Sequence, residues 1–307
     1  MTVVLLFEQL LNGLQLGIML FLMAAGLTLV FGIMNLINLA HGSLYMVGAY
    51  LAAAFMQWTG SYIWGVLLAL PATMAVGIVT EVVVLRSLYA RDHLDQVLAT
   101  FGLILFFNEA VRLIWGPQPQ FIDLPEFLSG QIEIIPGSPY PSFRLGIILV
   151  GLATAAFLYV LVTHTRIGMR IRAGASDRVM AGALGIDIRL LFTLVFGLGA
   201  VLAGLAGMMA APIVSVQSGM GEEILILTFV VIVIGGIGSI RGAFLAAILI
   251  GVIDTMGRAF LPQLLETFLE RGAAHTAGST IAAMLTYLLM AVVLFFRPQG
   301  LFPPRSR

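Results

Sequence analysis

The chain has 307 residues, of which 60% are hydrophobic and 10% are charged, and its formal net charge is zero. A soluble domain of this size carries about a quarter charged residues, so the composition excludes an ordinary soluble protein and gives no case for nucleic-acid binding. All 15 basic residues are arginine and cysteine is absent, which excludes disulfides, thiolate chemistry and cysteine metal ligands.

Apolar runs of about 20 residues recur along the chain, and each is long enough to cross a hydrocarbon core. Because the runs are continuously apolar, they predict helices rather than the alternating strands of a membrane barrel. We therefore predict an all-α polytopic membrane protein, a single transmembrane domain over residues 1–307 with about eight to nine transmembrane helices. The candidate crossings are residues 10–33, 43–58, 62–85, 96–115, 144–163, 190–211, 223–237, 242–260 and 279–296.

The first break between apolar runs, near residues 33–45, is polar but uncharged. A polar, glycine-containing break predicts a discontinuous helix, whose freed backbone groups must lie within protein or line a water-filled cavity. Ser43 is a candidate cap for the helix that follows. Two interpretations are open: the side chains line a solute path, or they only satisfy backbone groups at a tight turn. The candidate pathway residues are Asn35, Asn38, His41, Ser43 and Tyr45.

Small residues recur at a spacing of four within three of the crossings. Such rows let helix backbones approach closely in lipid, and they predict close packing either within this chain or against a second subunit. The rows are Gly13 and Gly17, then Gly199, Ala203 and Gly207, then Ala243, Ala247 and Gly251.

A few charged residues fall within or near the crossings, where ionisable groups are a functional hypothesis by default. Glu109 and Arg112 are three residues apart and Asp254 and Arg258 are four apart, so each pair can meet on one helix face as a structural ion pair. Glu81 has no opposite charge at either spacing.

Between two crossings, the proline-rich segment 116–143 excludes a long helix. Within it, residues 132–135 form a candidate short strand. The segment is expected to be either a solvated connection or a docking surface.

The longest basic interruption spans about residues 164–189 and carries five arginines. If it is cytoplasmic, alternation places 11 of the 15 arginines on that side, a strong positive-inside bias. We therefore expect the N-terminus outside and the C-terminus inside. Ala173, Asp177 and Ala181 recur every four residues and are expected to lie along one face of a short helix.

Motifs for enzyme chemistry are missing: the sequence has no zinc motif and no nucleophile elbow, and without lysine it cannot supply a P-loop lysine. We therefore expect no metal or cofactor in this chain, and ATP-driven transport would need a separate ATPase. One alternative is a stand-alone secondary transporter or channel for a small polar solute. Another is an intramembrane enzyme using Ser43 and His41, although positions two apart do not share a helix face.

Four motifs, spread from the first crossing to the tail, resemble the permease subunits of bacterial branched-chain amino acid ABC importers. The first is Asn-Leu-Ile-Asn-Leu-Ala-His-Gly-Ser at 35–43, and the second is Gly-Gly-Ile-Gly-Ser-Ile-Arg-Gly-Ala at 235–243. The third is the central pattern at 168–186, and the fourth is Arg-Pro-Gln-Gly-Leu-Phe at 297–302. Related systems move other small amino-acid-like solutes, so the resemblance leaves the exact solute open.

The resemblance implies a multi-pass permease in the bacterial inner membrane, forming the pathway for branched-chain or related amino acids. A second homologous permease subunit, two cytoplasmic ATPase subunits that bind ATP, and a periplasmic solute-binding protein would complete the importer. The family's central motif is associated with ATPase contact: small residues would let a coupling helix enter a groove, while Arg172 and Asp177 fix its orientation. The residues carried over are Arg172, Ala173, Asp177, Ala181 and Gly185.

Overall fold

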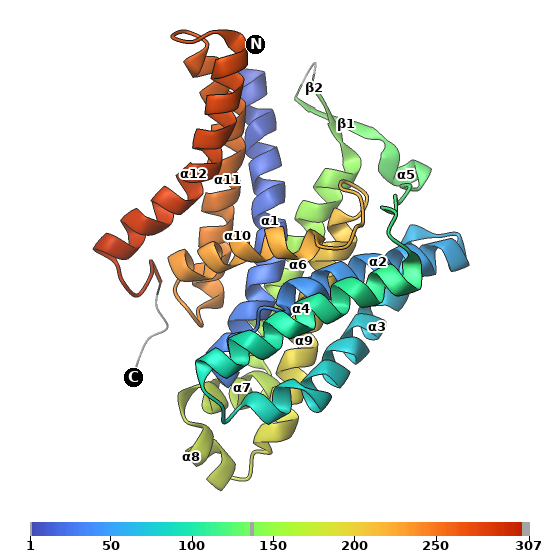
Figure 1. Ribbon diagram of the computed structural model, residues 1–307, viewed down its shortest axis with the longest axis vertical. Helices are drawn as coiled ribbons and strands as arrows, with labels where there is room; N and C mark the ends of the chain where they lie inside the picture. The colour runs from blue at the N-terminus through green and yellow to red at the C-terminus, as the bar shows by residue number, and fades with distance from the viewer. Residues whose placement is uncertain (1, 136–137, 303–307) are drawn as a thin grey trace. The chain divides into compact units, whose positions relative to one another are not determined.

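The computed structural model describes residues 2–135 and 138–302, and these form helices, loops and one two-stranded hairpin (Figure 1). The prediction of an all-α protein is therefore confirmed, and the expected strand at 132–135 lies within β1. The elements are α1 (Thr2–Met34), α2 (His41–Thr59), α3 (Tyr62–Val83), the 3-10 helix η1 (Leu85–Leu88), α4 (His93–Trp115), α5 (Glu126–Ser129), β1 (Gln131–Ile135), β2 (Ser138–Pro141), α6 (Ser142–His164), α7 (Arg166–Ser176), α8 (Arg178–Ala183), α9 (Ile188–Ala210), α10 (Met220–Gly235), α11 (Ile240–Leu265) and α12 (Arg271–Phe296).

Seven of the described helices are long and apolar enough to cross a membrane, namely α1, α3, α4, α6, α9, α11 and α12. Each of the nine predicted crossings coincides with a helix, but α2 and α10 do not meet this measure. Helix α10 has only 16 residues, a length of about 24 Å. Helix α2 has polar residues in its first turn. The polytopic prediction is thus confirmed, whereas a count of eight to nine spans is not.

Contacts between residues divide the chain into two compact units. Three of the four boundaries fall inside the continuous helices α1, α6 and α10, and the fourth lies just before α5. Unit 1 comprises Met1–Ala24, Glu126–Leu152 and Thr228–Arg307. Unit 2 comprises Ala25–Pro125 and Ala153–Leu227, and it contains both sets of predicted site residues.

In unit 1, helix α1 packs closely on α11 because glycines line the contact. A Cβ atom on Gly13 would lie 2.7 Å from the Cα of Val252, and one on Gly17 would lie 2.8 Å from the carbonyl oxygen of Ala247. Two of the predicted small-residue rows therefore meet within this chain. Helices α11 and α12 run side by side (Figure 1), and the ion pair between Asp254 and Arg258 forms within α11, at 2.8 Å.

In unit 2, helix α2 packs against both α3 and α9. The contact with α9 brings Gly48 onto the backbone of Gly204, and Gly207 onto the carbonyl oxygen of Tyr45. At the far end, the Tyr62 hydroxyl donates to the carbonyl oxygen of Met208 at 2.9 Å and fastens α3 to α9. These contacts fix the start of α2, and with it the polar break that precedes it.

Candidate functional site

The predicted helix break lies between the end of α1 at Met34 and the start of α2 at His41. Asn35 has φ = 52° and is the one non-glycine residue with positive φ between 2 and 135 or between 138 and 302. Its backbone amide donates to the carbonyl oxygen of Phe31 at 2.9 Å, as is usual for an asparagine that ends a helix in the left-handed conformation. The side chain is exposed, so Asn35 fits the turn interpretation.

Asn38 behaves differently from Asn35. Its side chain is 0% exposed, and neither its amide nitrogen nor its amide oxygen has a hydrogen-bond partner. A buried polar group left without a partner destabilises a fold by about 1–3 kcal/mol. A side chain that only satisfied a turn would make the bonds that Asn38 lacks, so the turn interpretation does not account for Asn38.

The other predicted pathway residues lie in the first turns of α2 and are buried. The His41 ring lies beside Gly26 of α1, and a Cβ atom there would come within 3.0 Å of the ring Cε1. The prediction that Ser43 caps α2 is wrong: the N-cap is Ala40, with no side-chain cap bond. The helix begins at His41, two residues before Ser43, so Ser43 already lies inside the first turn. Tyr45 is buried too, at 4% exposure.

Gln96 of α4 contacts the break and the connection before α4, a role that no local pattern in the sequence indicates. Its Nε2 donates to the carbonyl oxygens of Leu88 and Arg91, both at 3.2 Å. Its Oε1 lies 3.4 Å from the amide nitrogen of Ile37 in the break. The break is therefore tied to the connection between η1 and α4.

Glu81 was predicted to lack a partner within its helix, and it finds its partners elsewhere. Its carboxylate, 0% exposed, pairs with Arg86 through Nη2 at 3.1 Å. It also accepts from the hydroxyl of Tyr89 at 2.5 Å and from that of Thr193 at 2.8 Å. Burial and the hydrogen bond to Glu81 raise the pKa of Tyr89, which keeps the phenol protonated as a donor.

The basic segment at 164–189 folds into two short helices, α7 and α8, that lead into α9 (Figure 1). Each helix has a side-chain cap: Thr165 for α7, Asp177 for α8 and Asp187 for α9. Asp177 is extended, with φ = −152°, and its Oδ1 accepts from the amides of Val179 and Met180, both at 2.9 Å. Ala173, Asp177 and Ala181 therefore do not share one helix face as predicted, because the aspartate interrupts the helix.

The predicted coupling residues differ in exposure. Ala181 is buried and Ala173 is half-buried, whereas the other three are exposed. Gly185, with φ = 84°, ends α8, and the next amide, that of Ile186, donates to the carbonyl oxygen of Ala181 at 3.1 Å. No ion pair involves Arg172 in the part of the chain that the structure describes.

A surface feature that the sequence did not indicate is the apolar outer face of α8 and its C-terminal turn. Val179 is 84% exposed, Met180 is 58% exposed and Leu184 is 77% exposed. Helix α7 packs against the neighbouring helices, because Gly174 faces Leu191 of α9 and lies close to Ile33 in the last turn of α1. In this segment, α8 therefore exposes its apolar side chains, and α7 lies beside the end of α1, where the break begins.

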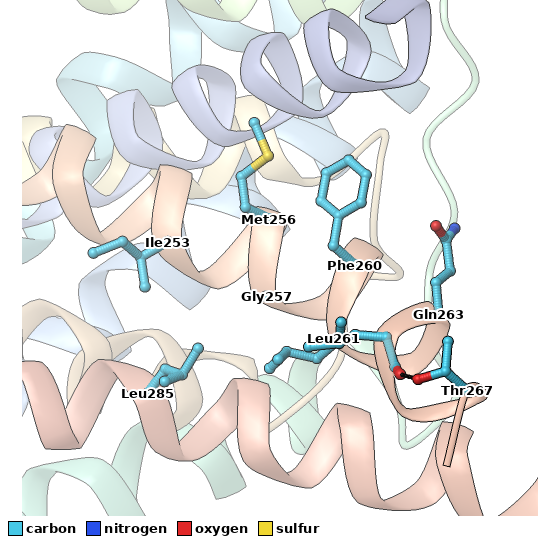
Figure 2. Close-up of a pocket in the computed structure, with 9 residues that line it drawn as sticks. Ile253, Met256, Gly257, Phe260, Leu261, Gln263, Thr267 and Leu285 are labelled. Carbon is cyan, nitrogen blue, oxygen red and sulfur yellow. Dashed lines mark hydrogen bonds between the residues drawn. The ribbon is translucent and has the colours of Figure 1, made fainter. Parts of the chain in front are cut away.

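An open groove of about 600 Å³ lies along α11 and α12 in unit 1 (Figure 2). Figure 2 shows Met256 and Phe260 projecting from α11, and Leu285 on α12. Of the lining side chains only Gln263 and Thr267 are polar. The groove contains none of the predicted pathway residues, and its apolar lining is unsuited to a zwitterionic solute.

Comparison with known proteins identifies the family. The profile of the family described as branched-chain amino acid transport system, permease component, matches residues 9–297. The chain is 31% identical to the high-affinity branched-chain amino acid transport system permease protein BraD of Pseudomonas aeruginosa, over 96% of this chain and 94% of BraD. It is 29% identical to the permease protein LivH of Escherichia coli, over 76% of this chain and 80% of LivH. No solved structure matches the chain. The chain therefore belongs to the family of permease components of branched-chain amino acid transport systems.

Proposed function

We propose that this chain is the transmembrane permease of an ABC importer that takes up branched-chain or related amino acids. ATP is bound and hydrolysed on two separate cytoplasmic subunits, a second permease subunit completes the pathway, and a periplasmic binding protein delivers the solute. The names of BraD and LivH support the solute class. The solute path runs past the break between α1 and α2, where Asn38 is buried without a partner.

The observation that carries this proposal is the outer face of α8. Three large apolar side chains, Val179, Met180 and Leu184, are exposed on a short segment in the most basic region of the chain. Exposed apolar groups rimmed by charge mark protein–protein contact sites, and buried apolar anchors supply most of the binding energy at such sites. We place the ATPase contact here, with Asp177 acting by capping α8 and Gly185 by ending it.

Negative charges introduced on α8 are expected to weaken binding of the ATPase. In the Val179→Asp, Leu184→Asp double variant, carboxylates replace the apolar anchors, so binding should weaken about tenfold or more. The first measurement is the amount of ATPase that co-purifies with the permease after both are expressed with their genomic neighbours. The second is uptake by proteoliposomes of a panel of amino acids that includes leucine.

The matched control is Phe121→Asp, which adds one carboxylate at a side chain that is 79% exposed in the connection after α4. This variant should retain the ATPase. Wild-type retention in the α8 double variant would contradict the assignment of α8. Uptake that proceeds without ATP or ATPase would instead favour a secondary transporter or channel.

The orientation is open to a direct test, because the natural chain has no cysteine. Alternation over the nine predicted crossings puts 11 of the 15 arginines on one side, and on that basis the α7–α8 segment and the C-terminus are expected to be cytoplasmic. A single Ser176→Cys substitution, at an exposed position, should react only with reagents that reach the cytoplasm. Labelling by an impermeant thiol reagent in intact cells with a permeabilised outer membrane would contradict this orientation.

A further inference from the structure

A continuous series of side-chain contacts in unit 2 begins on α8 and ends at the carboxylate buried in α3. The guanidinium carbon of Arg178, on α8, lies 6.0 Å from the centroid of the Phe192 ring on α9, within the range of a cation–π interaction. Phe192 meets the ring of Tyr89 edge to face, with 5.2 Å between the centroids. The Tyr89 hydroxyl then donates to Glu81 at 2.5 Å.

At the end of this series, Glu81 of α3 has three hydrogen-bond partners, two in or beside η1 and one in α9. Its carboxylate accepts from Arg86 in η1, from Tyr89 directly after η1, and from Thr193 in α9. Arg86 Nη2 also donates to the Thr193 hydroxyl at 2.9 Å, which closes the cluster. Since a buried carboxylate is stabilised only by such partners, Glu81 must follow them if they move, and α3 must follow Glu81.

We propose that Glu81 is a positioning residue that transmits movement of α8 to the membrane helices α3 and α9. The inference rests on the proposed function, because it takes α8 as the ATPase contact. Only four residues, 184–187, separate α8 from α9, so α8 cannot shift far without displacing Phe192 or breaking its contact with Arg178. Phe192 is 4% exposed, and its displacement must therefore move the Tyr89 ring packed against it.

Two mild substitutions test Glu81 without removing its charge partner. Tyr89→Phe keeps the ring contact but deletes the hydroxyl, and Thr193→Val keeps the shape of the side chain but deletes its hydroxyl. In the purified, reconstituted complex, we expect the ATPase to stay bound and the thermal unfolding midpoint to fall only modestly, because Arg86 still pairs with Glu81. The number of solute molecules imported per ATP should fall about two- to thirty-fold, and Thr193→Ser should restore it.

A double-mutant cycle tests whether Arg178 and Glu81 act through the same contacts. Arg178→Ala combined with Tyr89→Phe should lower the solute-to-ATP ratio by less than the product of the two single effects. The matched control is Arg170→Ala, on α7, whose effect should multiply independently with that of Tyr89→Phe. Multiplicative effects in both pairs would overturn the proposed route.

Failure of this inference can be told apart from failure of the proposed function. A wild-type solute-to-ATP ratio in both Tyr89→Phe and Thr193→Val, with the ATPase bound, overturns the role of Glu81 and leaves α8 as the contact. Unchanged ATPase binding in the Val179→Asp, Leu184→Asp variant overturns the contact itself.

Discussion

Replacing Gly207 with leucine is expected to drive α2 and α9 apart and to abolish transport. A Cβ atom at Gly207 would overlap the carbonyl oxygen of Tyr45 and lie 3.4 Å from the amide nitrogen of Ala49. These are backbone atoms of a helix, so they cannot rotate away as a side chain can. Overpacking usually costs about 1–3 kcal/mol, and a backbone clash should cost at least that, lowering the thermal unfolding midpoint in detergent by about 5 °C or more.

The control for Gly207 is a helical glycine with open space around it. Gly102, in α4, is exposed and would bring a Cβ atom to no other group within 4 Å. Gly102→Leu should leave the unfolding midpoint unchanged or slightly higher, since leucine favours a helix over glycine by about 0.5–1 kcal/mol. Equal midpoints for Gly207→Leu and Gly102→Leu would contradict the close packing of α2 on α9.

Much of this fold could be predicted because apolar runs and their breaks are local in the sequence. Each predicted crossing coincides with a helix, and the break falls at residues 35–40, where Asn35 and Asn38 interrupt the apolar pattern. Helix ends were predicted less well where a cap decides them. Asp177 divides α7 from α8 because its side chain accepts hydrogen bonds from two backbone amides. The four-residue spacing of Ala173, Asp177 and Ala181 instead suggested that one helix continues through the aspartate.

The site residues that escaped prediction depend on contacts between distant segments. Arg86 is five residues from Glu81, so the rule that residues three or four apart meet on one helix face does not pair them. They meet because α3 ends at Val83 and η1 follows it. Thr193 is 112 residues away from Glu81, and Gln96 is 59 away from Ile37, so no local pattern could pair them. The sequence likewise could not show which asparagine of the break is buried.

Because Asn38 is the buried asparagine, Asn38→Leu is expected to affect stability and uptake differently: stability should be kept or increased, and uptake should fall. Leucine has about the same shape as asparagine but no polar atoms, and the amide it replaces has no hydrogen-bond partner. Replacing a buried, unpartnered polar group by an apolar one is neutral or stabilising, by up to about 1–3 kcal/mol. The thermal unfolding midpoint of the permease should therefore stay the same or rise.

Uptake by the same Asn38→Leu variant should fall by about tenfold or more, because an amide with a free donor and a free acceptor offers a passing amino acid two hydrogen bonds that leucine cannot. The measurement is initial uptake of labelled leucine or a related amino acid by the reconstituted complex, beside the unfolding midpoint. The matched control is Asn35→Gly, since glycine adopts the positive φ of Asn35 without strain, and it should keep wild-type uptake. Wild-type uptake in Asn38→Leu would leave the amide no role in the pathway, and a lowered midpoint would show that the amide does have a stabilising partner.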